Sequence, residues 1–229
     1  MKGFNSNGYI IRISENAVIQ MCLNGLEAYS IAHKKGKRFQ KHLETLGQLW
    51  GHELELPNKK TLYCVELTSI DTSAERYQDS CEPNDEALQL KRNILTSFWP
   101  QYDFLGDFHT HPYQNYLDVP KEKLYLFSEA DFESIENRTE FWEPNNYRVG
   151  LVLTIAQMSK RSSKGFRRYD SSTLEFTLGN YRVWLKGYVA YIDGKEIKLS
   201  EHYDDGVLLE CPALTGLNMA YTEFDNYLN

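Results

Sequence analysis

The stretch Phe104-Leu-Gly-Asp-Phe-His-Thr-His111 combines the two features that decide the fold prediction, an apolar run and a pair of histidines. The apolar residues predict a short buried strand. Residues two apart on a strand point to the same face, so His109 and His111 can direct both imidazoles at one point. Two convergent imidazoles are half of a typical zinc site. An H-x-H triplet also arises by chance, so the remaining ligands must be found elsewhere.

Two other stretches carry suitable groups. Ser128-Glu-Ala-Asp131 places a hydroxyl and a carboxylate three residues apart at the expected start of a helix, where they can share a face. Glu44-Thr-Leu-Gly-Gln-Leu-Trp-Gly51 reads as a strand whose glycines allow close approach of backbone. A hydrolytic zinc site needs three protein ligands, an open position for water, and a carboxylate that moves a proton. His109, His111 and Asp131 could be the ligands, with Glu44 as the proton carrier and Ser128 as the oxyanion donor.

Together, Glu-x-x-Gly-x-Leu-x-Gly, His-x-His-Pro and Ser-x-x-Asp resemble the signature of the JAMM (JAB or MPN-plus) zinc metalloprotease family. The resemblance implies one zinc ion per chain, held by His109, His111 and Asp131, with Glu44 as general acid/base. Ser128 would stabilise the tetrahedral intermediate. It also implies a JAB/MPN-like fold and hydrolysis of amide bonds after the C-terminal tail of a ubiquitin-like protein. The chain looks most like a stand-alone prokaryotic-type member, whose partner would be that protein or its conjugate.

One departure from the family pattern is the segment between the second histidine and Ser128. The family has roughly seven residues there, whereas residues 112–127 intervene in this chain. The aromatic-rich insertion 113–127 is either a lid or wall beside the site or a surface loop with its own small core. It contains Asp118, a rival for the third ligand position. Asp131 is preferred because position 115, three residues before Asp118, is Asn and not Ser.

Each of these groups also has a simpler interpretation. The role of Ser128 and Asp131 could be no more than a helix cap. Glu44 could be a solvated carboxylate at a strand edge, and the histidines could be buried without metal. Three other functions stay open for the whole chain. They are a metal-free scaffold that binds protein partners, a zinc hydrolase of small peptides or amides, and a DNA-linked role. The net charge of −7 makes the last the least favoured.

The composition predicts a globular chain with one domain at residues 9–199 and a C-terminal extension, 200–229, that packs on it. The four cysteines are widely spaced, which argues against a disulfide framework or a cysteine zinc finger. No apolar stretch is long enough for a membrane span and no signal peptide is recognisable, so a cytoplasmic location is expected. The acidic charge disfavours nucleic acid as a partner. The basic run 160–168 is expected to be a hairpin tip or a patch for an acidic partner.

Hydrophobic periodicity predicts a mixture of strands and helices. Helices are expected over 15–33 and 85–99 and near Ser128, and residues 71–84 read as a polar loop. Strands are expected over 9–14, 44–55, 61–70, 104–111, 147–156, 173–178, 181–192 and 195–199, the last two joined by an Asp193-Gly194 turn. This order predicts an α+β fold, an α/β/α-type sandwich with one curved mixed sheet flanked by helices.

Overall fold

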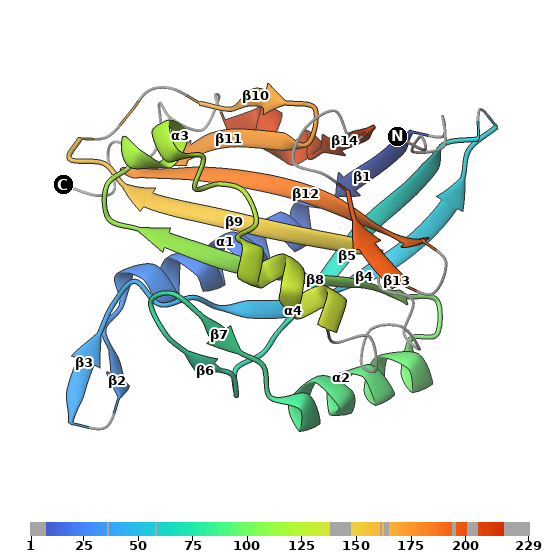
Figure 1. The fold of residues 1–229 in the computed structure, drawn as a ribbon, viewed down its shortest axis with the longest axis horizontal. Coiled ribbons are helices and arrows are strands. Elements are labelled where there is room, and N and C mark those ends of the chain that lie inside the picture. Colours follow the sequence, from blue (N-terminus) through green and yellow to red (C-terminus); the bar gives the residue numbers. More distant parts are fainter. Residues whose placement is uncertain are drawn as a thin grey trace.

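The computed structural model describes residues 8–35, 37–57, 59–137, 148–160, 162, 165–193, 196–200 and 206–217. A curled mixed sheet of ten strands forms the centre of the molecule, with helices on both faces (Figure 1). The order across the sheet is β10-β11-β12-β9-β8-β4-β5-β1-β14, and β13 also pairs with β12. The predicted α+β sandwich is therefore confirmed.

The strands of the main sheet are β1 (Tyr9–Ile13), β4 (Leu46–Glu55), β5 (Thr61–Ile70), β8 (Asp103–Tyr113), β9 (Val149–Gln157), β10 (Arg167–Asp170), β11 (Thr173–Leu178), β12 (Tyr181–Asp193), β13 (Glu196–Leu199) and β14 (Val207–Glu210). The helices are α1 (Glu15–Ser30), α2 (Asp85–Phe98), α3 (Asp118–Glu122), α4 (Glu129–Asn137) and a 3₁₀ turn at Pro212–Gly216. Two small hairpins are β2 (His33–Lys35) with β3 (Arg38–Gln40), and β6 (Glu75–Arg76) with β7 (Cys81–Glu82). None of the helices in these described ranges is long and apolar enough to cross a membrane.

The sheet has a separate hydrophobic core on each face. The Ser14 hydroxyl accepts a hydrogen bond from the Ala17 backbone N–H and caps α1, which packs behind the sheet in Figure 1. On that face the core includes Met21 of α1 and Leu151 of β9. On the opposite face, Ile135 of α4 belongs to a second core with Phe127, Val152 and Tyr188. Strand β9 is thus buried on both faces, as its apolar run predicts.

The structure differs from the predicted elements in the first half of the chain. Helix α1 ends at Ser30, three residues before the predicted end, and His33 begins the β2–β3 hairpin instead. The predicted polar loop 71–84 contains the β6–β7 hairpin. Glu44 lies two residues before β4 and not on it. These short elements depend on pairings between polar segments, which leave little apolar periodicity in the sequence.

The second half differs in how its segments join the sheet. Residues 207–210 of the expected C-terminal extension form β14, which pairs in parallel with β1 and so extends the sheet. Part of the basic run becomes β10, antiparallel to β11, while Arg161, Ser163 and Lys164 lie outside the described residues. Tyr147 and Gly194 also lie outside them, although Asp193 pairs with Glu196 across the predicted turn.

Two glycines allow neighbouring strands of the sheet to approach closely, Gly106 between β8 and β9 and Gly51 between β4 and β5. Gly106 of β8 has a φ of 146°, and a Cβ there would lie 2.0 Å from the Val149 carbonyl oxygen. A Cβ at Gly51 of β4 would lie 1.8 Å from the Cys64 carbonyl oxygen. The close backbone approach predicted for the glycine-containing strand is therefore confirmed at Gly51.

Candidate metal centre

The pairing of β4 with β8 places the candidate residues on one face of the sheet. Leu46 lies opposite His109 in the antiparallel register, and backbone hydrogen bonding continues beyond it, since the Thr110 N–H donates to the Thr45 carbonyl. Side chains alternate along each strand, so Glu44 is directed to the same face as His109 and His111. All three residues line one pocket of about 330 Å³.

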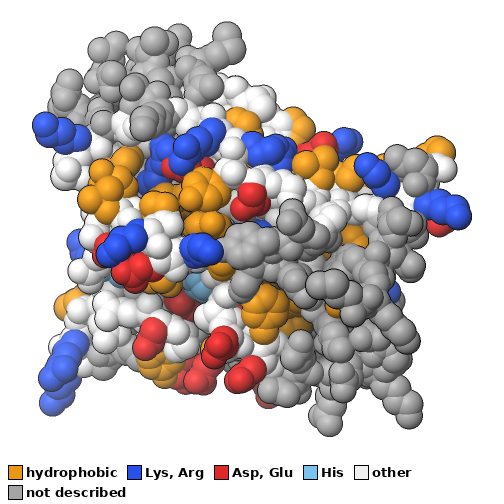
Figure 2. Space-filling view, turned by 45° about the horizontal axis from the view of Figure 1, so that its top comes forward, with side chains coloured by type: hydrophobic (Ala, Val, Ile, Leu, Met, Phe, Trp, Pro, Cys, Tyr) orange, Lys and Arg blue, Asp and Glu red, His pale blue; other side chains and the backbone are white. Residues whose placement is uncertain are grey.

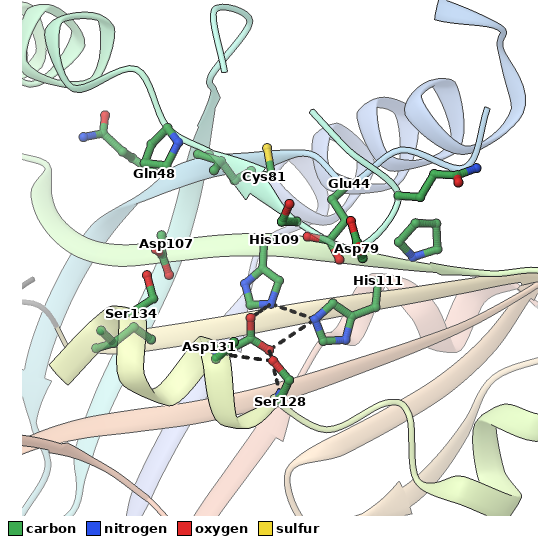
Figure 3. A pocket seen from close by; sticks show the side chains of 18 of the residues that line it. Glu44, Gln48, Asp79, Cys81, Asp107, His109, His111, Ser128, Asp131 and Ser134 are labelled. Carbon is green, nitrogen blue, oxygen red and sulfur yellow. Dashed lines mark hydrogen bonds and ion pairs between the residues drawn. The ribbon is translucent and has the colours of Figure 1, made fainter. Parts of the chain in front are cut away.

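Asp131 completes a group of three possible metal ligands, as predicted (Figure 3). The Nε2 atoms of His109 and His111 are 3.1 Å apart. The Asp131 carboxylate lies 3.3 Å from His109 Nε2 through Oδ1 and 3.2 Å from His111 Nε2 through Oδ2. Ligands bound about 2.0–2.2 Å from a tetrahedral zinc ion lie roughly 3.3 Å from one another. The nature and the spacing of these donors therefore fit a zinc ion.

The charges of the three ligands are strongly coupled. Burial opposes ionisation of Asp131, but the two histidines outweigh it and hold the pKa of the carboxyl well below its usual range. Burial lowers the pKa of His109, yet Asp131 outweighs this effect and raises it to about 9. Burial lowers the pKa of His111. The site thus offers an ionised carboxylate and a neutral imidazole at neutral pH, and His109 must release a proton before it can bind a metal.

Ser128 and Asp131 form a reciprocal cap at the N-terminus of α4. The Ser128 hydroxyl donates to Asp131 Oδ2 at 2.8 Å and accepts from the Asp131 backbone N–H at 3.2 Å. The Ser128 backbone N–H donates to the same Oδ2 at 2.6 Å. This is the helix cap that the simpler interpretation predicts. The same contacts orient the Asp131 carboxylate toward the histidines, so capping and ligand positioning share one set of hydrogen bonds.

Glu44 lies in the pocket with an environment suited to proton transfer. Its side chain is 8% exposed, and its backbone N–H donates to the Tyr77 carbonyl at 2.7 Å. Burial raises the pKa of Glu44 to about 7, with His109 lowering it and Asp131 and Asp79 raising it further. In Figure 3, Glu44 and Asp79 lie close together on the side of the histidines away from Asp131. A carboxyl group that titrates near neutral pH can both accept and return a proton.

Several other residues line the same pocket and were not predicted from the sequence. Asp107 has the i−2 spacing from His109, a signal that could have identified it. Asp79 and Cys81 arrive through the β6–β7 hairpin, which the sequence did not predict. Burial raises the pKa of the Cys81 thiol to about 12, so it stays protonated. Tyr113, the last residue of β8, also lines the pocket, and burial raises the pKa of its phenol, followed by the charges of Glu44 and Asp131.

The insertion also contacts a ligand at its last residue, since the Phe127 ring centroid lies 5.1 Å from that of His109, whereas its middle part lies apart from the site. Asp118 accepts a hydrogen bond from the Asn115 side chain at 2.8 Å and does not belong to the ligand group. Val119 and Tyr125 are buried against Ala156 and Trp184 of the sheet. The insertion thus has a small core of its own. Of residues 113–127, all of which the structure describes, Tyr113 alone lines the pocket.

The pocket is open to the molecular surface. Figure 2 shows a histidine side chain at the base of a depression, with acidic side chains gathered beside and below it. Four carboxylates line the pocket, and no Lys or Arg is found among the described residues that form its wall: Glu44, Asp79, Asp107 and Asp131 are the acidic members. The site therefore favours a neutral or basic ligand.

Comparison with known proteins assigns no family. No protein-family model matches the chain, and no curated protein matches it. Among solved structures, the chain is similar to the solution structure of protein DSY2949 from Desulfitobacterium hafniense, with 14% sequence identity and a TM-score of 0.43. The similarity covers 87% of this chain and 92% of the other. The resemblance to the JAMM family accordingly rests on the site residues of this chain alone.

Proposed function

We propose that the protein is a zinc-dependent isopeptidase or peptidase that hydrolyses the amide bond after the C-terminal tail of a ubiquitin-like protein. The observation that carries the proposal is the convergence of His109, His111 and Asp131 in one pocket with Glu44. The order of these residues resembles the JAMM signature, apart from the longer segment between His111 and Ser128, and this resemblance supplies the reaction type.

The chemistry divides among the residues of the pocket. His109, His111 and Asp131 would hold the metal, and a bound zinc ion would act as a Lewis acid that lowers the pKa of water toward 7. Glu44 accepts a proton from the attacking water as the water oxygen bonds to the amide carbon. It then returns this proton to the amide nitrogen as the C–N bond breaks, which leaves a carboxylic acid and an amine.

The nature of the substrate rests on two weaker supports. The resemblance implies a ubiquitin-like tail, and the four carboxylates of the pocket suit a tail that is neutral or basic. A pocket of about 330 Å³ has room for a small amide or short peptide as well. Hydrolysis of such small substrates is the second candidate, because it would use the same residues.

The test compares zinc-loaded wild type with Glu44→Gln, and with Glu55→Gln as a control at the exposed end of β4. Each protein is assayed on a fluorogenic amide of a ubiquitin-like C-terminal tail and on a short fluorogenic peptide amide. We expect Glu44→Gln to keep its zinc and to lose about 100-fold or more in kcat on the tail amide, while Glu55→Gln stays near wild type.

Other outcomes separate the alternatives. Near-normal turnover by Glu44→Gln would remove Glu44 from the reaction. Cleavage of the short amide alone would favour the small-substrate hydrolase. Binding of the ubiquitin-like protein without cleavage of either amide would favour a scaffold.

A further inference from the structure

The resemblance gives Ser128 the role of oxyanion donor, but its hydroxyl is already used. A serine hydroxyl has a single O–H to donate, and that of Ser128 points to Asp131 Oδ2 at 2.8 Å. Donation to a substrate would break this hydrogen bond and loosen the carboxylate that the histidines contact. The Ser128 hydroxyl therefore positions Asp131. It is not available to donate a hydrogen bond to the oxyanion that develops on the attacked amide.

Tyr113 presents a second hydroxyl to the same pocket. It follows His109 and His111 at i+4 and i+2 on β8, so its side chain shares their face of the sheet. Its ring meets the His111 ring edge-on, with centroids 6.3 Å apart and an interplanar angle of 88°. The Tyr29 hydroxyl of α1 donates to the Tyr113 carbonyl at 2.8 Å and fixes the backbone there.

The Tyr113 side chain is half-buried and its phenol is an available donor. Among the described residues, no hydrogen bond to its hydroxyl is present. The carboxylates that act on it electrostatically are Glu44 and Asp131, which lie on either side of the histidines in Figure 3. The ring that carries the hydroxyl thus lies beside His111, in the pocket where the amide would react. A phenol keeps its proton at neutral pH and can donate a hydrogen bond there.

We propose that the Tyr113 hydroxyl donates a hydrogen bond to the carbonyl oxygen of the attacked amide and stabilises the negative charge that develops on it. No covalent bond to Tyr113 forms and its proton is not transferred. This inference rests on the proposed function and makes Tyr113 a catalytic residue of that reaction. A preorganised donor directed at a developing oxyanion is among the largest contributions that one side chain makes to catalysis.

The experiment uses Tyr113→Phe, which removes the hydroxyl and retains the ring that contacts His111. Tyr116→Phe is the matched control, because Tyr116 belongs to the same segment but does not line the pocket. Zinc content, kcat on the fluorogenic tail amide, and the Kd for a tripeptide phosphinate are measured for each zinc-loaded protein. In the phosphinate, a tetrahedral PO₂⁻ group stands in for the attacked carbonyl, so its binding reports on the donor without turnover.

We expect Tyr113→Phe to keep its zinc, to lose about 100-fold in kcat, and to bind the phosphinate about 10-fold more weakly. Tyr116→Phe should match wild type in all three measurements. Wild-type kcat and phosphinate affinity in Tyr113→Phe would overturn the inference while leaving the proposed function in place.

Ser128→Ala provides the complementary variant. Weakened zinc binding is expected if Ser128 positions Asp131. Full zinc affinity with a 100-fold fall in kcat would assign the oxyanion to Ser128 and overturn the division of roles. If zinc-loaded wild type neither cleaves the amide nor binds the phosphinate, the proposed function fails, and the inference about Tyr113 fails with it.

Discussion

Asp131 connects three features of the site at the scale of single residues. Its carboxylate contacts both histidines, accepts two hydrogen bonds from Ser128 and completes the cap of α4. The spacing of Ser128 and Asp131 was sufficient to predict the cap, because residues three apart at a helix start can bond reciprocally. The carboxylate also contacts the histidines because α4 packs beside them. The position of α4 on the sheet cannot be predicted from the spacing of Ser128 and Asp131.

The cap predicts a measurable contribution to stability. Ser128→Ala removes the side-chain half of the reciprocal cap and should lower the free energy of unfolding of the metal-free protein by about 1 kcal/mol. Ser134→Ala, farther along the same helix, should have a smaller effect. Urea denaturation of the three proteins measures the difference, and an equal effect of both substitutions would contradict the role of the cap.

Glu44 predicts a pH dependence of stability. Its pKa is about 7 in the folded protein, against an ordinary value of 4.5, so the folded state holds its proton more tightly than the unfolded state. The free energy of unfolding of the metal-free protein should therefore fall as pH rises from 4.5 to 7. Glu44→Gln removes this loss. The free energy of unfolding of the variant minus that of wild type should therefore be up to about 3 kcal/mol larger at pH 8 than at pH 4.5.

The measurement is denaturant unfolding of wild type and Glu44→Gln in buffers on both sides of the titration. A difference between the two proteins that does not change with pH would show that Glu44 titrates at its ordinary pKa.

At the scale of elements, the strand alternation of β8 placed His109 and His111 on one face, and the sequence was sufficient to predict this. Residues 46–55 of the predicted strand 44–55 form β4, which pairs with β8, whereas Glu44 itself precedes β4. The β6–β7 hairpin, which brings Asp79 and Cys81 to the pocket, was not predicted. Its strands are only two residues long, so no periodic pattern can develop in the sequence.

Gly106 tests how tightly β8 is held against β9. Gly106→Ala places a Cβ 2.0 Å from the Val149 carbonyl oxygen at a φ of 146°, so β8 must shift. We expect a loss of several kcal/mol in the free energy of unfolding. Gly179→Ala is the control, since its φ is also positive, at 62°, but nothing lies within 4 Å of the added Cβ. Its cost should be near 1 kcal/mol, and equal costs at both positions would contradict the close approach.

The insertion packs on the sheet through its own small core. Substitutions at its buried positions should therefore lower the free energy of unfolding more than substitutions at its exposed positions. Val119 of α3 is fully buried, whereas Leu117, two residues before it, is 59% exposed. Val119→Ala should lower the free energy of unfolding by about 2 kcal/mol, and Leu117→Ala should change it by less than about 0.5 kcal/mol. Thermal or urea unfolding distinguishes them, and similar small effects would show that the insertion does not pack on the sheet.

At the scale of the whole molecule, the fold class followed from the order of strands and helices, because each long element carries its own periodicity. The order of strands in the sheet did not, since pairs such as β1 with β14 join residues about 200 positions apart. The site lies where the pairing of β4 with β8 and the packing of α4 bring residues 44, 109, 111 and 131 together. The signature predicted the members of the site, and the fold determines their geometry.

The zinc content of the protein shows whether His109, His111 and Asp131 hold a metal ion. Elemental mass spectrometry of wild type, Asp131→Asn and Asp118→Asn compares a predicted ligand with a carboxylate of the insertion that accepts a hydrogen bond from Asn115 and lies outside the ligand group. We expect about one zinc ion per chain in wild type and in Asp118→Asn, and loss of zinc in Asp131→Asn. Zinc lost with Asp118→Asn and kept in Asp131→Asn, or no zinc in wild type after reconstitution, would contradict a zinc site formed by His109, His111 and Asp131.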